Sequence, residues 1–225
     1  MGTAAGMAPA PLGNVEAEGS RCADSGHRQR ERRNRQDDHG GDPGPRLGHA
    51  GQRILLVDSD TQGQAGRALG QRPSVGLAEV IAGRLAAAQA LTQARPGLQL
   101  LAGGEGLALA KREISRRDVG SEWVIAEALE PLAGAFDWAI VDTGPGWDVL
   151  TVNAIFACDA VLAPVSLELL ALMGLADFAR GLEKVQRYHQ APLRWVLPTF
   201  ADRRRRQTGE LLEQLRAHYG DRVCA

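Results

Sequence analysis

The stretch that decides the fold is Arg53-Ile54-Leu55-Leu56-Val57-Asp58-Ser59-Asp60-Thr61-Gln62. Its four consecutive apolar residues are typical of a strand that is buried on both faces of a parallel sheet. The strand ends in two carboxylates, Asp58 and Asp60. Ligands of such sheets bind beyond the carboxyl ends of the strands, so these two side chains are the first candidates for a functional site.

From Arg53 onward, short apolar strands alternate with longer amphipathic helices, which predicts a doubly wound α/β fold with a mostly parallel sheet. The expected strands are Ile54–Val57, Leu98–Leu101, Trp138–Val141, Ala160–Ala163 and Trp195–Leu197. The expected helices are Gly76–Gln93, Ser121–Ala133, Val149–Phe156, Leu170–Tyr188 and Thr208–Tyr219. Strand ends that would share one edge of the sheet carry Asp58, Asp142, Pro164 and Pro198.

Size and composition fit one domain with a sizeable core, because the 225 residues (24.0 kDa) are 44% hydrophobic. The formal net charge of −1 predicts no global attraction to nucleic acid or membrane. The cysteines, at positions 22, 158 and 224, show neither metal-ligand spacing nor a disulfide framework, which fits a reducing cytosol. No apolar run approaches the roughly twenty residues of a membrane-spanning helix.

The first fifty residues differ from the rest. Of Ile, Leu, Val, Phe, Trp and Tyr they contain only Leu12, Val15 and Leu47, and they hold seven arginines but no lysine. Such a segment cannot bury enough apolar surface to offset its ordering entropy, so it is expected to be disordered as a polypeptide. We therefore divide the chain into residues 1–50 and a folded domain of residues 51–225.

A second strand-and-acid stretch, from Phe136 to Pro145, ends in Asp142-Thr143-Gly144-Pro145. Together with the Asp-x-Asp-x-Gln ending at Gln62, it resembles the ParA/MinD family of deviant P-loop ATPases. The resemblance extends over about residues 53–222 and includes Asn153-Ala154 and the strand that ends in Pro164. It implies a P-loop NTPase-like sheet, ATP and Mg²⁺ as cofactors, and ATP hydrolysis as the activity.

The family also needs a Lys-Gly-Gly-x-Gly-Lys-Thr loop about twenty residues upstream, whose backbone N–H groups and lysine hold phosphates and whose Thr binds Mg²⁺. Residues 31–40 instead read Glu-Arg-Arg-Asn-Arg-Gln-Asp-Asp-His-Gly. They contain no lysine, and Glu31, Asp37 and Asp38 would repel an anion. The first strand and the phosphate-binding loop are thus missing or scrambled, and we expect the chain as written to bind ATP poorly or not at all.

The next reading frame of the same codons is compatible with the missing loop. From Glu31 to His39 it admits Lys-Gly-Gly-Ile-Gly-Lys-Thr-Thr-Thr, and from Gly40 to Ala50 it admits an apolar helix. The second lysine then takes the position of Gln36, twenty-two residues before Asp58. We therefore predict a frameshift that is recovered near Gly51, with a basic disordered tail as the alternative.

The resemblance also implies roles for individual residues. Asp60 would orient the attacking water as the catalytic residue, while Asp58 and Asp142 would hold Mg²⁺, which suits a reaction that depends on positioning and charge stabilisation. The alternative is that Asp142 is a strand-end carboxylate that begins a turn and that Asp58 and Asp60 belong to a solvated loop, but the two acidic stretches together favour the functional interpretation. The adenine would be bound by Pro198, Thr199 and Asp202; Thr199 replaces the asparagine common there, which puts its base contacts in question.

The basic run of Arg203, Arg204, Arg205 and Arg206 is either a solvated face or a contact for the DNA backbone. We expect a ParA-like ATPase for plasmid or chromosome partitioning that forms an ATP-driven homodimer, binds DNA nonspecifically and is stimulated by a ParB-like partner. Its expected location is cytoplasmic and nucleoid-associated, with no membrane association evident. Because relatives continue beyond the helix that ends at Tyr219, we expect the chain to be C-terminally truncated. The alternatives are a nucleotide-independent DNA- or partner-binding remnant and another deviant P-loop enzyme, of the cobyrinate-amidase or dethiobiotin-synthetase kind.

Overall fold

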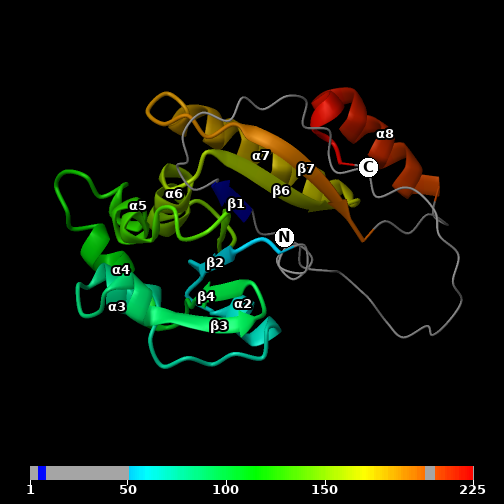
Figure 1. Cartoon of the computed structure of the whole chain (residues 1–225). Coiled ribbons are helices and arrows are strands. Elements are labelled where there is room, and N and C mark those ends of the chain that lie inside the picture. The colour runs from blue at the N-terminus through cyan, green and yellow to red at the C-terminus, as the bar shows by residue number, and fades with distance from the viewer. Residues whose placement is uncertain (1–4, 9–50, 201–205, 225) are drawn as a thin grey trace, which may run out of the picture.

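The computed structural model describes residues 5–8, 51–200 and 206–224, and of residues 5–8, 206 and 207 only the backbone (Figure 1). Its strands are β1 (Ala5–Ala8), β2 (Ile54–Asp58), β3 (Leu91–Arg95), β4 (Leu98–Leu101), β5 (Trp138–Asp142), β6 (Ala160–Ser166) and β7 (Leu193–Thr199). Its α-helices are α2 (Gln64–Ala68), α3 (Leu77–Ile81), α4 (Gly106–Ile114), α5 (Val124–Leu129), α6 (Val149–Phe156), α7 (Leu169–Val185) and α8 (Arg206–Tyr219). Short 3₁₀ helices are η1 (Ala87–Ala90), η2 (Glu130–Leu132) and η3 (Gly220–Arg222).

The strands form one seven-stranded sheet in the order β3-β4-β2-β5-β1-β6-β7. Strand β2 pairs in parallel with β4 and β5, and β6 pairs in parallel with β7. Strand β3 is antiparallel to β4, and β1 is antiparallel to both of its neighbours. The predicted α/β fold with a mostly parallel sheet is confirmed.

Strand β1 occupies the place between β5 and β6. Without a strand between them, β5 and β6 would each have a row of backbone N–H and C=O groups without partners. The four-residue strand β1 supplies these partners. Ala5 lies beside Asp142 and Leu162, and Ala8 lies beside Ala139, so β1 starts at the edge where β5 ends. The chain therefore leaves β1 at the opposite edge of the sheet. Residues 5–8 are an exception to the expected disorder of residues 1–50.

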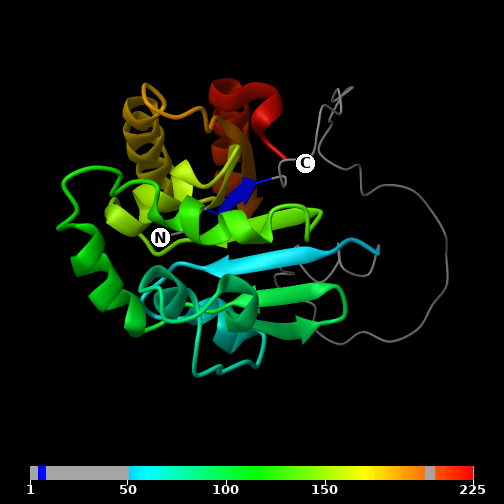
Figure 2. The same ribbon diagram turned by 60° about the vertical axis from the view of Figure 1, so that its left-hand side comes forward.

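Both faces of β2 are buried, as its apolar run predicts. Leu55 and Val57 pack with α3, α4, α5 and α6 on one face, while Ile54 and Leu56 pack near α2 on the other. This division follows from the alternation of side chains along a strand. Helices α7 and α8 lie with β6 and β7 at one end of the sheet, and α2 and α3 lie towards the other end (Figure 2).

The helix predicted over Gly76–Gln93 is wrong. Only Leu77–Ile81 is α-helical and Gly83 follows with a positive φ of 67°. The rest of the range holds the short 3₁₀ helix η1 and the start of β3 (residues 91–95). Pro96 and Gly97 connect β3 to β4 as a two-residue hairpin loop, with Gly97 at φ 74°. A Pro-Gly pair between two short runs is a turn signal, and it outweighs the helical periodicity of the alanines and leucines before it.

The other predictions hold with shifted ends. All five predicted strands exist, but Pro164 and Pro198 lie inside β6 and β7 rather than at their ends, because these strands continue to Ser166 and Thr199. The predicted helix Ser121–Ala133 is shortened to α5 followed by η2. Helices α2 and α4 were not predicted.

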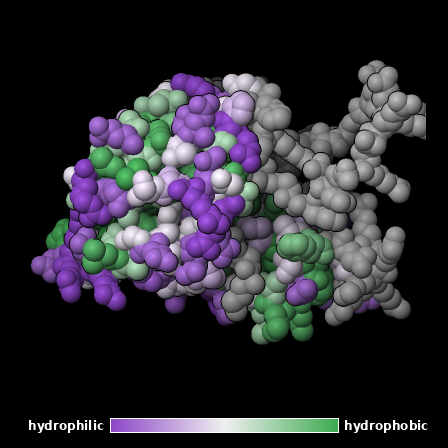
Figure 3. Space-filling model, turned by 90° about the horizontal axis from the view of Figure 1, so that it is seen from below, coloured by the Kyte–Doolittle hydropathy of each residue, from purple (hydrophilic) through white to green (hydrophobic). Residues whose placement is uncertain are grey.

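The predicted apolar stripe of α7 packs as expected. Leu175 and Leu182 are buried against β6, and Phe178 and Val185 pack at their border. Within the described part of the chain, no helix is long and apolar enough to cross a membrane. The face seen from below shows many hydrophilic residues with smaller hydrophobic groups among them, and a larger hydrophobic group beside residues drawn in grey (Figure 3).

Candidate functional site

Asp58 ends β2 and is completely buried. One carboxylate oxygen, Oδ1, accepts a hydrogen bond from the backbone N–H of Asp60 (3.0 Å), and Oδ2 accepts one from the N–H of Ala65 (3.0 Å). Burial raises the pKa of Asp58, and backbone N–H donors from Asp60, Gly66 and Ala65 offset only part of this effect. The carboxylate therefore organises the loop that follows its own strand.

Asp60 lies two residues further on and is 9% exposed. Its Oδ1 accepts a hydrogen bond from the N–H of Gln62 (3.0 Å), and its backbone carbonyl accepts from Gly63 and Gly104. A Cβ added at Gly144 would lie 3.0 Å from Asp60 Oδ1. The loop after β5 thus approaches the Asp60 carboxylate through backbone that carries no side chain.

The loop after β2, residues 59–63, is also held by the backbone after β4. A Cβ at Gly103 would lie 2.6 Å from both the carbonyl oxygen and Oδ1 of Asp58, and 2.7 Å from the carbonyl of Asp60. Only glycine fits at such a close approach of two backbone segments. Gly103 is a site residue that sequence reasoning missed; the pair Gly103-Gly104 directly after a buried strand was the available signal.

Asp142 ends β5 and lies in register beside Asp58. Its backbone carbonyl accepts hydrogen bonds from the N–H (2.9 Å) and the hydroxyl (2.7 Å) of Ser59. The Asp142 side chain is half-buried. The sheet therefore brings together the three acids that the sequence predicted, Asp58, Asp60 and Asp142, at the carboxyl ends of two adjacent strands.

The loop after β5, residues 143–147, ends in Trp147, whose ring stacks on Phe178 of α7 with centroids 5.1 Å apart and an interplanar angle of 21°. The indole also covers Gly181, where an added Cβ would overlap the ring. A glycine in the middle of a helix costs about 1 kcal/mol relative to alanine. Gly181 is explained by the space that Trp147 needs.

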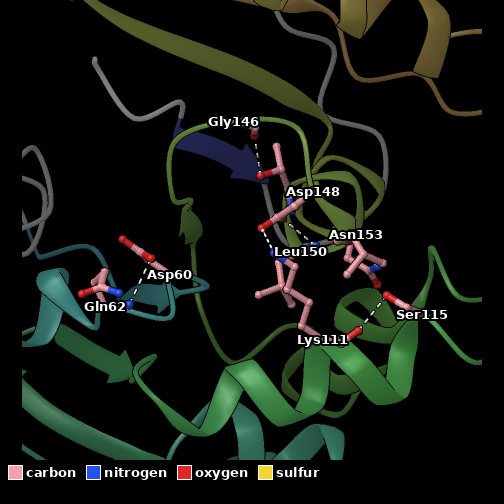
Figure 4. Close-up of polar contacts among 10 residues, drawn as sticks. Asp60, Gln62, Lys111, Ser115, Gly146, Asp148, Leu150 and Asn153 are labelled. Atoms are coloured by element: carbon pink, nitrogen blue, oxygen red, sulfur yellow. Dashed lines mark hydrogen bonds and ion pairs between the residues drawn. The ribbon is translucent and has the colours of Figure 1, made fainter.

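Asp148 follows this loop and caps α6, because its Oδ1 accepts hydrogen bonds from the N–H groups of Leu150 and Thr151 (both 2.9 Å). Its Oδ2 pairs with Lys111 Nζ of α4 at 2.7 Å. Partial burial raises the pKa of Asp148, but the Lys111 pair and the backbone donors outweigh it and leave the pKa below its usual value. Figure 4 shows Lys111 pointing from α4 towards Asp148, with Asp60 apart from this group.

The Asn153-Ala154 motif has a structural role. Asn153 is completely buried; its Nδ2 donates to the carbonyls of Ser121 (2.7 Å) and Val149 (2.8 Å), and its Oδ1 accepts from Ile125 N–H (3.2 Å). All its contacts go to backbone groups of α6 and of the segment that contains α5. Asn153 therefore ties α5 to α6.

The predicted adenine segment lies at the same sheet edge but away from the acids. Thr199 ends the edge strand β7, with Pro198 directly before it, and β7 lies three strand positions from β5, or roughly 14 Å at the usual strand spacing. Phe200, to which the sequence patterns gave no role, follows with a positive φ of 52° and is 90% exposed. Asp202 and Arg203–Arg205 lie outside the described residues, and only the backbone of Arg206 is described.

A pocket of about 260 Å³ lies between the 143–147 loop, β6 and α7. Its walls are mostly apolar, and Trp147, Pro164 and Phe178 are among them. Thr143 and Thr151 supply hydroxyl groups, and the Thr151 hydroxyl donates to the Gly146 carbonyl (3.0 Å). The pocket therefore lies directly beyond the acid-bearing end of β5.

Carboxylates are the ligands that Mg²⁺ prefers, and Asp142 suits this role by its position and partial exposure. Asp58 suits it less well, since both of its oxygens accept backbone N–H bonds. Among the described residues, no group of three or more His, Cys, Asp and Glu side chains is gathered for a metal ion. Strand β1 starts rather than ends at this edge of the sheet, so among the described residues it offers no strand end here for a phosphate-binding loop.

Comparison with known proteins matches residues 44–195 to the family described as "AAA domain". The chain is 32% identical over 189 residues to the chromosome partitioning protein ParA of Caulobacter vibrioides. This match covers 80% of this chain and 70% of the Caulobacter protein. It is 33% identical over 179 residues to the chromosome-partitioning ATPase Soj of Thermus thermophilus, covering 79% and 69%. The match to the family starts at residue 44, so residues 31–40 lie outside it.

Among solved structures, the chain resembles a cobyrinic acid a,c-diamide synthase from Mycobacterium smegmatis, solved with a bound ATP analog and magnesium. The sequence identity is 34%, the TM-score is 0.73, and the match covers 79% of this chain and 74% of the synthase. A plasmid partition protein from Borrelia burgdorferi shares the fold at 20% identity and a TM-score of 0.67, covering 80% of this chain and 78% of that protein. The family match over residues 44–195 and the partitioning relatives at 32–33% identity show that the chain belongs to the family of ParA-like P-loop ATPases.

Proposed function

We propose that this chain derives from a partitioning ATPase that segregates plasmids or chromosomes, and that the chain as written is defective in ATP binding. The observation that carries the proposal is the alignment of Asp58 with Asp142 at adjacent strand ends, with Asp60 beside them. Identity above 30% to ParA and Soj proteins supports the partitioning role.

The positions of the three acids suit them to different roles in ATP hydrolysis. Asp60 would orient the attacking water, since its carboxylate sits where the loops after β2 and β5 meet. Asp142 would hold Mg²⁺, and Asp58 would contribute to its shell through water while it fixes the loop. Bound Mg²⁺ and ATP would supply charge neutralisation and the phosphoryl group, and the protein would contribute positioning and electrostatics.

The remaining partners follow from the family. An ATP-driven homodimer would bind DNA nonspecifically, with Arg203, Arg204, Arg205 and Arg206 as phosphate contacts. A ParB-like protein would stimulate hydrolysis and release. The base would lie on Pro198, Thr199 and Asp202, and the protein would be cytoplasmic and associated with the nucleoid.

The defect would lie in the segment before Gly51. A restored chain, in which the codons before Gly51 are read in the other frame, regains Lys-Gly-Gly-Ile-Gly-Lys-Thr from position 31. Restoration is the natural test, because it changes the phosphate-binding segment and leaves the acids untouched.

Titration with a fluorescent ATP analogue checks this directly. We expect no saturable binding by the written chain and Mg²⁺-dependent binding by the restored chain. In the restored chain, Asp60→Ala should abolish hydrolysis and leave ATP binding intact, because orienting water does not contribute to ground-state affinity. Failure of the restored chain to bind nucleotide would overturn the proposal, and unchanged hydrolysis by Asp60→Ala would remove the catalytic role of Asp60.

A second candidate is a ligase, favoured by the 34% identity to the cobyrinic acid a,c-diamide synthase. The two readings differ in what stimulates ATP turnover of the restored chain. DNA together with a ParB-like partner should accelerate a partitioning ATPase, whereas cobyrinic acid should accelerate a ligase. Turnover that depends on cobyrinic acid and is indifferent to DNA would replace the partitioning proposal.

A further inference from the structure

Helix α4 presents one basic face to the loop after β2. Lys111 lies four residues before Ser115, and Arg112 lies four residues before Arg116, so these side chains form two neighbouring rows on α4 and the turn that follows it. With Thr61 opposite, they line an open hollow of about 550 Å³. We call Lys111, Arg112 and Arg116 the α4 basic face.

Two of the three cations are available to a ligand. Lys111 is neutralised by Asp148, but Arg112 and Arg116 are exposed and have no carboxylate partner within the part of the chain that the structure describes. Arg53 and Arg117, by contrast, each pair with an acid, Asp137 and Glu127 respectively. The two guanidinium groups thus leave an uncompensated positive charge at the rim of the hollow.

The chemistry of the hollow fits a phosphate backbone rather than a base. Its lining contains no aromatic and no large apolar side chain on which a base could stack. Thr61 and Ser115 add hydroxyl groups, which commonly contact phosphate oxygens. Arg112 lies in the last turn of α4 and Arg116 in the turn directly after the helix, so the two long side chains can reach different phosphates of one strand.

We propose that the α4 basic face is a second contact site for the phosphate backbone of duplex DNA, separate from the arginine run 203–206. The inference deepens the proposed DNA-binding function and rests on it. Because Thr61 directly follows Asp60, DNA at this site would lie next to the proposed catalytic loop. The contact needs no nucleotide, so the chain as written should already make it.

The test measures binding of the full written chain to a fluorescent DNA duplex at several salt concentrations. In the variant Arg112→Gln/Arg116→Gln, affinity should fall and the slope of log affinity against log salt should decrease by about two, since each phosphate contact contributes about 0.9. The control Lys184→Gln/Arg187→Gln removes the same charge from exposed positions at the end of α7. It should leave the slope unchanged.

Each outcome decides the matter. Equal losses in the two double variants would mean that only net charge matters and would overturn the site. No loss in Arg112→Gln/Arg116→Gln, or no duplex binding by the written chain, would overturn it as well. Neither result bears on the ATPase proposal, which is tested separately by nucleotide binding to the restored chain. Unchanged thermal melting of both variants shows that folding is intact, as expected for exposed side chains.

Free phosphate compounds distinguish the source of the ligand. Inorganic phosphate and ATP, at equal ionic strength, should not displace the duplex from the written chain. Displacement at low concentration that is lost in Arg112→Gln/Arg116→Gln would show a site for a small phosphate compound and would overturn the assignment to DNA.

Discussion

The loops after β2 and β5 meet at Asp60, yet they are fixed in different ways. Residues 59–63 are held from within, by hydrogen bonds from backbone N–H groups to the Asp58 and Asp60 carboxylates and by the close approach of Gly103. Residues 143–147 are held at their far end, where Trp147 rests on α7.

The two loops therefore differ in rigidity: the loop after β2 is stiffened by its own hydrogen bonds, whereas the loop after β5 is attached mainly through one side chain. A buried network of carboxylates and backbone N–H groups has one favourable arrangement, so the loop after β2 is pre-organised. The loop after β5 contains Gly144, Pro145 and Gly146, and its position depends on a side chain that is 41% exposed, Trp147. The first loop can hold a catalytic carboxylate in place, and the second is the one suited to respond to a ligand.

The strongest way to break the first loop is Gly103→Ala. The added Cβ would meet backbone and carboxylate oxygens of Asp58 at 2.6 Å, and backbone cannot move aside as a long side chain can. We expect a loss of about 2–3 kcal/mol in the free energy of unfolding, as for other overpacked sites. Urea unfolding measures it.

The matched control is Gly174→Ala in α7, where no atom lies within 4 Å of the added Cβ. It should stabilise the protein by up to about 1 kcal/mol through helix propensity. Equal unfolding curves for Gly103→Ala and wild type would show that the loop is not tightly held.

Asp148, directly after the loop that follows β5, tests how much the far end of that loop contributes to stability. Asp148→Ala removes both the cap of α6 and the Lys111 pair and should cost about 1–2 kcal/mol at pH 7, whereas Asp148→Asn keeps a capping oxygen and should cost less. The folded pKa of Asp148 lies below its usual 3.8, so the charge-dependent contribution is present above that pH and is lost as pH falls through the folded pKa.

Unfolding free energies at pH 7 and pH 3 test this sign. The difference between wild type and Asp148→Asn should shrink at pH 3. A difference that grows on acidification would contradict the role of the ion pair.

The smallest effect on stability should come from Gly181→Ala, which displaces Trp147 but improves helix propensity by about 1 kcal/mol. The net loss should be about 1 kcal/mol or less, while Trp147, which is already partly exposed, becomes more accessible to acrylamide quenching. The double variant Gly181→Ala/Trp147→Leu shows how much of the quenched fluorescence comes from Trp147. It also removes the overlap between the added Cβ and the indole ring. Unchanged quenching in Gly181→Ala would mean that the indole does not rest on this helix face.

Sequence patterns identified most of the sheet because buried parallel strands leave a strong local signal: uninterrupted apolar runs that end in acids. The runs before Asp58 and Asp142 are of this kind, and both strands were predicted within one residue. Strand β3 was not predicted, because Leu91–Arg95 has only one buried residue, Ala94, and continues a helix-like series of alanines. The hydrogen bonds to β4, which are not local, decide its conformation.

The sequence by itself determined the fold class, the family and the three acids at one sheet edge, since strand direction and motif spacing are written in local residue order. Only the tertiary structure decided that Asp58 is buried and bonded to its own loop, that Gly103 and Gly181 make room for Asp58 and Trp147, and that Arg112 and Arg116 face Thr61. Those features depend on which segments approach each other in space. Contacts between residues tens of positions apart follow from packing of the whole sheet, and no short stretch of sequence encodes them.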